Sequence, residues 1–135
     1  MNERLPFNGN VMTVRHATGW TFLEAELHPG HAPPVHLHRN EEEAFYLLSG
    51  SMRFKRGDDI LELGPGDFVA VSAGVPHAFV VGPEGARTIQ VATGTDLADF
   101  IREASGSEGI DEVSRAAERH DMVIVGPPLD DDSTQ

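Results

Sequence analysis

The segment Val35-His36-Leu37-His38, with Glu43 five residues further on, says most about how this chain folds. Side chains two apart on a β-strand point to the same face of a sheet, so the imidazoles of His36 and His38 share one face. The preceding residues, 29–34, are too rich in proline to form a regular central strand. We therefore expect the two histidines where a strand emerges from a rigid loop.

Two further side chains can join this pair. Glu43 stands at the start of the apolar run 44–48, where a tight turn can return its carboxylate toward the imidazoles. His77 begins another β-type run directly after Gly74-Val75-Pro76. Three neutral imidazoles and a carboxylate suit one divalent ion, such as Fe, Ni, Mn, Co, Cu or Zn, and leave one or two positions open. The sequence predicts an open metal site made by His36, His38, Glu43 and His77.

Short β-type runs alternate with turn-forming residues from residue 11 to about residue 93, as in an antiparallel sandwich or barrel. Turns are expected at residues 50–51, 57–59, 64–67 and 82–85, because glycine permits positive φ and proline fixes φ. The expected strands are residues 11–16, 21–27, 35–38, 44–48, 52–56, 60–63, 68–72, 77–81 and 88–92.

The pattern changes to helical spacing after residue 95. Leu97, Phe100 and Ile101 recur at i, i+3 and i+4, and Asp96 fits an N-cap. A second helix is expected over residues 111–119, and the Gly-Pro-Pro sequence at 126–128 is expected to end regular structure. The chain then divides into an N-terminal arm (1–10), a β-barrel (11–95), and C-terminal helices with an acidic tail (96–135). Its closing acidic run, residues 130–132, is typical of a solvated tail.

Composition narrows the possible partners and chemistry. A chain of 135 residues encloses one core, and 22 acidic residues against 10 basic ones give a formal charge of -12. That charge repels phosphate backbones and anionic lipids, so neither nucleic acid nor membrane is expected as a partner. The absence of cysteine excludes disulfides, thiolate ligands and cysteine nucleophiles. No run approaches the ~20 apolar residues that span a bilayer, and we expect a cytoplasmic protein.

With these residues in place, the chain resembles a single-domain cupin. The first cupin motif is a Gly, five residues, His-x-His, three or four residues, a Glu, six residues and a Gly. Gly30, His36, His38, Glu43 and Gly50 meet it with every spacing intact. The resemblance implies an all-β protein with a cupin jelly-roll β-barrel, followed here by two short helices.

The second cupin motif is met less completely. Gly66, Gly74 and His77 stand at its spacing, whereas Ser72 and Val81 replace the family's Pro and Asn. Neither of those two positions is a ligand in the family, so the departures concern the geometry of the strand ends. Two motifs in order at the right separation make a specific signal.

The run of three glutamates leaves one choice open. Glu43 is the better ligand, because only Glu43 has six residues before Gly50. Glu42 fits the shorter spacing that the motif also allows, and it stays the alternative.

Within the cupins, three segments look most like the small bacterial proteins similar to quercetin 2,3-dioxygenase. They are EAFYLLSG at 43–50, GPGDFVAV at 64–71 and GPPL at 126–129. The resemblance implies dioxygen-dependent ring opening of a flavonol or related enol, with release of carbon monoxide. Glu43 then serves as a ligand or leaves the ion to take the enol proton. The expected partner is a small aromatic substrate.

Aromatic side chains near the ligands are candidates for the substrate pocket. By strand parity Phe45 shares the face of Glu43, and Phe79 shares the face of His77. Met52 and Phe54 are weaker candidates of the same kind. Plain core packing is the competing role for all four residues, because a small barrel must be filled.

The four remaining histidines are interpreted as surface or core residues, and His31 is expected to come nearest to the site. They are His16, His28, His31 and His120.

Other functions and assemblies fit the same residues. A polyketide cyclase or isomerase would use Zn as a Lewis acid without redox chemistry, and a binding module would hold a small molecule without turnover. No helix-turn-helix segment precedes residue 11, which argues against a one-chain transcriptional regulator.

Small cupins commonly pair through sheet edges, so we expect a homodimer joined by uncovered strands at residues 11–16 and 21–27.

Overall fold

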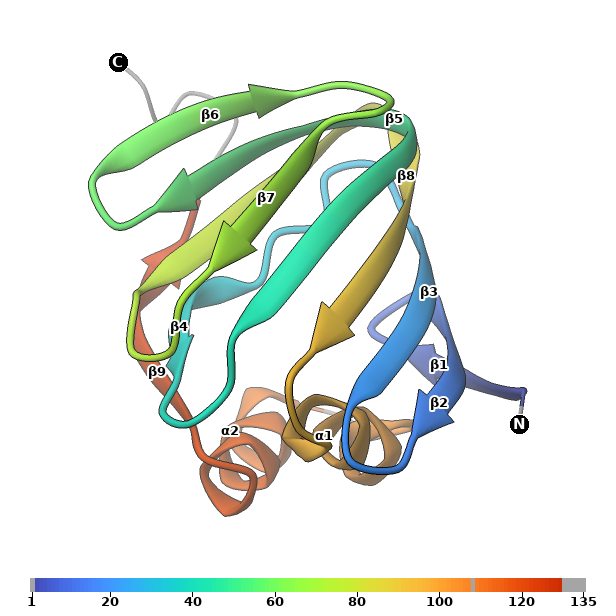
Figure 1. Ribbon diagram of the computed structural model, residues 1–135, viewed down its shortest axis with the longest axis vertical. Helices are drawn as coiled ribbons and strands as arrows, with labels where there is room; N and C mark the ends of the chain where they lie inside the picture. The colour runs from blue at the N-terminus through green and yellow to red at the C-terminus, as the bar shows by residue number, and fades with distance from the viewer. Residues whose placement is uncertain (1, 108, 130–135) are drawn as a thin grey trace.

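A computed structural model describes residues 2–107 and 109–129 as a curled antiparallel sheet with two helices across one end (Figure 1). The jelly-roll architecture predicted from the sequence is confirmed. Its elements are β1 (Glu3–Phe7), β2 (Asn10–Ala17), β3 (Thr21–Leu27), β4 (Pro34–His38), β5 (Glu43–Arg56), β6 (Asp59–Leu63), β7 (Phe68–Val71), β8 (His77–Ala92), α1 (Asp96–Ala104), α2 (Ile110–Arg119) and β9 (Met122–Pro128).

Two long strands hold the sheet together. The order along the main path is β1-β2-β3-β8-β4-β9, and β5 pairs with β8 while it also carries β6 and β7. The sequence pattern predicts four shorter strands here, with turns at residues 50–51 and 82–85. The prediction of these two turns is wrong. Strands β5 and β8 run through both glycine-containing segments and pair along most of their length, with register shifts near Gly50. Glycine marks bends and bulges as readily as turns, so the sequence alone does not separate them.

Gly50 shows why a bend needs glycine at this point. Its φ is +85°, and a Cβ atom there would lie 1.9 Å from the carbonyl oxygen of Gly85 on β8. The two long strands therefore approach each other at a point where no side chain fits.

The N-terminal arm predicted over residues 1–10 is instead strand β1, joined to β2 by a tight hairpin. Asn8 and Gly9 both have positive φ, as a two-residue hairpin loop requires, and Phe7 pairs with Asn10. Because β1 covers β2 and β3 pairs with β8, residues 11–16 and 21–27 are not sheet edges. The expectation that these two strands are uncovered is wrong, and the homodimer itself stays a prediction.

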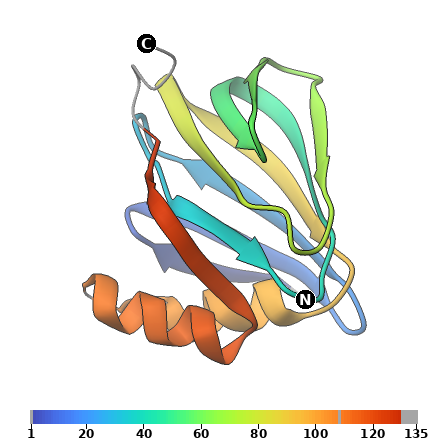
Figure 2. The ribbon, with the colours of Figure 1, turned by 90° about the vertical axis from the view of Figure 1, so that its left-hand side faces the viewer.

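Strand β9 was not predicted. It lies beside β4, with His36 opposite Ile124 and His38 opposite Met122 (Figure 2). The Gly-Pro-Pro sequence at 126–128, expected to end regular structure, forms the last part of this strand. Proline is tolerated there because β9 is the terminal strand in the sheet order. The acidic run at 130–132 lies outside the described residues.

Both predicted helices form, and they lie at the same end of the sheet in Figures 1 and 2. Leu97, Phe100 and Ile101 are buried on α1, and the ring of Phe100 meets that of Phe7 edge-on at 5.7 Å. The N-cap of α1 is Thr95, so Asp96 is not the cap.

None of the helices in the described part of the chain is long and apolar enough to cross a membrane.

We predict that Gly50→Ala destabilises the fold by about 3 kcal/mol or more, because the new methyl group meets β8 backbone and the φ is strained. Urea unfolding measures the effect. Gly57→Ala is the matched control: its φ is also positive, at +59°, but nothing lies within 4 Å of the added Cβ. We expect that control to cost about 1 kcal/mol. Equal losses in the two variants would show that the strands do not approach closely at Gly50.

Candidate metal centre

Three strands bring the four predicted ligands together. His36 and His38 lie on β4, Glu43 begins β5, and His77 begins β8. One ligand atom from each residue can be chosen so that all four lie within 4.8 Å of one another. His36 and His77 are direct partners across the β4–β8 ladder. The spacing read from the sequence therefore becomes a single cluster of one carboxylate and three imidazoles.

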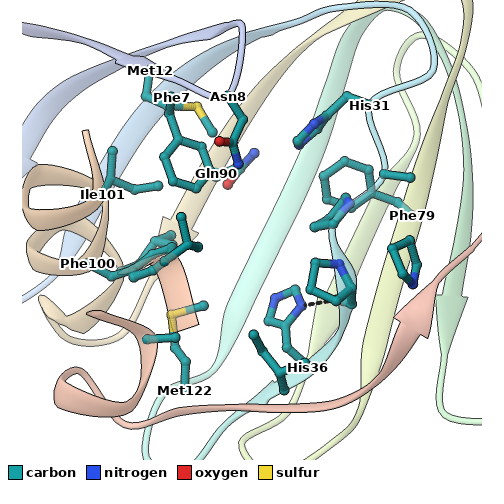
Figure 3. A pocket seen from close by; sticks show the side chains of 18 of the residues that line it. Phe7, Asn8, Met12, His31, His36, Phe79, Gln90, Phe100, Ile101 and Met122 are labelled. Atoms are coloured by element: carbon teal, nitrogen blue, oxygen red, sulfur yellow. Dashed lines mark hydrogen bonds between the residues drawn. The ribbon is translucent and has the colours of Figure 1, made fainter. Parts of the chain in front are cut away.

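Backbone carbonyl groups fix the orientation of two imidazoles. Nδ1 of His36 donates to the Pro34 carbonyl at 2.8 Å, drawn as a dashed line in Figure 3, and Nδ1 of His77 donates to the Val75 carbonyl at 3.0 Å. A carbonyl can only accept, so Nδ1 carries the hydrogen in both rings. The lone pair of each neutral ring then lies on Nε2, the arrangement that outer hydrogen bonds impose on metal-binding histidines.

His38 and Glu43 complete the donor set. Nε2 of His38 lies 2.9 Å from Oε1 of Glu43, and the same oxygen lies 3.2 Å from Nε2 of His77. Both ring nitrogens of His38 are buried without a hydrogen-bond partner of good geometry. A buried imidazole of this kind, beside a buried carboxylate, fits a divalent ion with nitrogen and oxygen ligands.

The charges in the cluster match what such an ion needs. Burial would raise the pKa of Glu43, but the imidazoles of His38 and His77 outweigh it and hold the pKa far below its usual range. Burial, with a contribution from His77, lowers the pKa of His36 to about 4. For His38, burial is the largest single effect and lowers the pKa, but the charge and hydrogen bond of Glu43, with the charges of Glu41 and Asp96, together raise it. Glu43 is therefore an anion and His36 a neutral base at neutral pH.

The three consecutive glutamates have three different environments. Glu43 is 3% exposed and lies in the cluster, whereas Glu42 is exposed to solvent. Glu41 is buried, and its Oε2 accepts the backbone N–H of Asp96 at 2.8 Å. Glu41 thus satisfies the first turn of α1 from a distant part of the chain. Of the two glutamates that the motif allowed, only Glu43 belongs to the cluster.

The cluster opens onto a cavity of about 510 Å³ whose lining is mostly apolar. His36 and Glu43 reach it, and so do Phe45 and Phe79, two of the residues predicted for the pocket. The other two, Met52 and Phe54, belong to the core behind the lining. Phe54 stacks at 6.2 Å on the ring of His77 and at 6.1 Å on Phe79, so it supports the cavity wall from outside.

The far wall of this cavity was not predicted from the sequence. Side chains from both helices and from β9 form it (Figure 3). The helical spacing of residues 97, 100 and 101 did identify an apolar face. Nothing in the sequence indicated that this face covers a cavity and not only the core. The wall residues are Leu97, Phe100, Ile101, Val113, Ala117 and Met122.

Comparisons with known proteins agree with this architecture. A family model described as "Cupin domain" matches residues 23–91. No similar sequence was found among curated proteins. An RmlC-like cupin from Shewanella frigidimarina superposes with a TM-score of 0.63 at 20% identity, over 68% of this chain and 83% of that one.

Two enzymes are among the similar structures. A variant of oxalate decarboxylase from Bacillus subtilis has a TM-score of 0.62 at 23% identity, over 70% of this chain and 28% of that longer chain. The nucleoside dehydratase Pac13 has a TM-score of 0.57 at 18% identity, over 69% of this chain and 77% of that one. At these identities the likeness shows the fold alone.

We predict that His36→Ala and His77→Ala each weaken binding of Zn²⁺ at least about tenfold, because each removes one of four ligands. Metal content after dialysis, measured by elemental analysis, and calorimetric titration test this. His16→Ala is the control, since His16 packs against Trp20 away from the cluster. Unchanged metal content in both ligand variants would show that the ion binds elsewhere.

Metal affinity should rise with pH. Only a neutral imidazole binds an ion, and Glu43 holds the pKa of His38 above its ordinary value. Protons therefore compete with the ion most strongly below that pKa, and the competition fades above it. We expect the affinity for Zn²⁺, measured against a competing chelator, to increase steadily from about pH 5.5 to about pH 8. A constant affinity over this window would mean that His38 is not a ligand.

Proposed function

This chain belongs to the cupin family, and we propose that it is a metal-dependent enzyme acting on a flat aromatic molecule that carries an enol. The finer proposal is a dioxygenase of the quercetin 2,3-dioxygenase type. One observation carries it: the three-histidine, one-glutamate cluster opens directly onto an apolar cavity. An ion that takes five or six ligands keeps one or two positions for substrate when four protein side chains hold it, and such an open position distinguishes a catalytic site from a closed structural one.

The size and lining of the cavity support an aromatic substrate. Its volume of about 510 Å³ falls within the range of pockets that take drug-sized molecules. Phe45 and Phe79 both line the cavity and meet edge-on, with ring centroids 5.9 Å apart and planes at 66°, so a ligand there meets aromatic edges and faces. Flat rings pack well against such faces.

The residues of the site divide the chemical work between them. When bound, a divalent ion supplies Lewis acidity that makes an enol hydroxyl more acidic, and with a redox-active metal it also supplies electron transfer. Glu43 is ionised, and it serves as a ligand or leaves the ion to take the proton of that hydroxyl, whose own pKa the ion would lower. The backbone-bound rings of His36 and His77 hold the donor set in place. The apolar lining keeps bulk water away from the reacting carbons.

Reconstitution with one metal at a time identifies the ion that supports this reaction. Mn(II) centres are named for the Bacillus subtilis oxalate decarboxylase that shares this fold, so Mn joins Fe, Ni and Co among the ions to test. Affinity order and metal supply decide occupancy as much as ligand type does.

We predict that the protein, reconstituted with Fe, Ni, Co or Mn, consumes dioxygen in the presence of quercetin and releases carbon monoxide. An oxygen electrode and gas analysis measure the two. Glu43→Gln should lower kcat at least about 100-fold. The matched control is Glu42→Gln, which changes an exposed neighbour of the same type and should leave kcat unchanged.

Other outcomes decide between functions. Absence of oxygen uptake with every metal would contradict the dioxygenase. Ring closure or isomerisation without oxygen would then indicate the non-redox enzyme. Tight binding of the flavonol without any product would indicate a binding module.

A further inference from the structure

His31 lies in the cavity wall, away from the four candidate ligands. It is 8% exposed and lines the cavity, and its ring meets that of Phe79 edge-on at 5.9 Å (Figure 3). Its backbone is held on both sides, because its N–H donates to the His28 carbonyl at 3.1 Å and its carbonyl accepts from Val81 at 2.9 Å. The backbone that carries the ring is therefore fixed in position. The sequence alone indicated only a surface or core residue that comes near the site.

Asn10 determines which nitrogen of His31 carries the hydrogen. The side-chain Oδ1 of Asn10 accepts the backbone N–H of His28 at 2.9 Å, and this backbone donor fixes the amide orientation. The amide Nδ2 of Asn10 must then face Nδ1 of His31, at 3.3 Å. An amide NH₂ can only donate, so Nδ1 of His31 accepts and Nε2 bears the hydrogen. Asn10 is itself 2% exposed, so water does not replace it in this role.

The Nε2–H group of His31 is left as a donor for something else. Among the residues that the structure describes, no hydrogen-bond partner of Nε2 is found. Burial lowers the pKa of His31 to about 4, with the nearby His28 adding to the effect, so the ring is neutral at pH 7. Nε2 of His31 is not among the fully buried side-chain atoms that lack a partner, so a molecule in the cavity that His31 lines can reach it.

Aromatic rings connect this donor to the metal cluster. Phe79 contacts His31 at 5.9 Å and Phe45 at 5.9 Å, and Phe45 in turn lies 6.4 Å from His77. Because Phe45, Phe79, His31 and Glu43 line the same cavity, a flat molecule packed between these side chains can place one oxygen at the cluster and a second oxygen near His31. The distance between the metal cluster and the Nε2–H group of His31 then selects among aromatic substrates by the placement of their oxygens.

We propose that His31 is a specificity-determining residue, whose Nε2–H donates to a second, neutral oxygen of an aromatic substrate in a subsite separate from the metal ligands. In a flavonol the oxygen is a phenol oxygen on a ring remote from the enol, because the enol oxygen and its neighbouring carbonyl lie at the metal cluster. This assignment rests on the proposed function for the class of substrate, whereas the donor itself rests on the hydrogen bonds of Asn10. Removing the donor leaves the metal cluster intact, so the two can be tested apart.

The first experiment follows the nitrogen atoms of His31 by NMR in histidine-¹⁵N-labelled protein at about pH 7, where an unperturbed histidine is largely neutral. We expect the neutral Nε2–H form. Acetophenone, a neutral aromatic ketone, should shift the Nε2 resonance at millimolar concentration. Ethylbenzene has nearly the same shape without the carbonyl, and it should shift only the aromatic lining. A charged ring, the Nδ1–H form, or equal responses to the two probes would overturn the proposal.

The second experiment compares two flavonols by calorimetry on metal-loaded protein. Quercetin and 3-hydroxyflavone share the enol, but 3-hydroxyflavone lacks the additional ring hydroxyls. Loss of one hydrogen bond should weaken quercetin binding about tenfold in His31→Leu and leave 3-hydroxyflavone nearly unchanged. His31→Gln, whose amide can donate from a similar position, should restore part of the difference. Metal content should stay at the wild-type value, whereas the unfolding midpoint should fall in His31→Leu, because the buried amide of Asn10 loses its acceptor.

The outcomes separate this proposal from the proposed function. If His31→Leu weakens both flavonols equally, His31 acts by shape alone and the donor role is wrong. If wild-type protein binds neither flavonol while acetophenone still shifts Nε2, the subsite stands and the flavonol proposal fails. If neither flavonols nor acetophenone reach Nε2, the subsite is wrong.

Discussion

The pairing of His36 with His77 across β4 and β8 is the contact on which the candidate metal centre depends. These two residues are distant in sequence, and only the ladder brings their imidazoles together, with ring centroids 4.4 Å apart. His38 follows because it shares the face of His36. Glu43 is paired along the sheet with Val71 on β7 and Ala92 on β8, and its side chain reaches His38 and His77 across the interior. A slip of one residue in this ladder would turn both β4 histidines to the opposite face.

Backbone carbonyl groups lower the free-energy cost of burying the cluster inside an apolar barrel. Burying four polar side chains is unfavourable unless their atoms have partners. Carbonyl groups of Pro34 and Val75 hold two rings, and Glu43 lies against His38 and His77. Both ring nitrogens of His38 are left without a hydrogen-bond partner, and the cluster meets the cavity through His36 and Glu43. The same structure therefore holds a charge in the interior and leaves it accessible to a small molecule.

Much of the fold and of the cluster could be predicted from the sequence. Alternation and spacing identified most of the strand segments, both helices and the four clustered residues, because these signals are local, but they missed β1 and β9. The long bends at Gly50 and in β8 could not be predicted, since a glycine in a strand and a glycine in a turn look alike. Asn8-Gly9 is a strong hairpin signal, yet the short β1 before it was interpreted as an arm. The roles of Asn10 and His31 depend on contacts between distant segments, which no local pattern records.

One divalent ion, held by three imidazoles and one carboxylate at the edge of the cavity, is central to every function considered for this protein. X-ray absorption at the metal edge of the Zn²⁺-loaded protein tests this coordination most directly. We predict three imidazole nitrogens and one carboxylate oxygen at about 2.0 to 2.2 Å, with any further ligand being a light atom from water. A spectrum with one imidazole or none, dominated by carboxylate oxygens, would contradict this coordination and place the ion on the acidic surface instead.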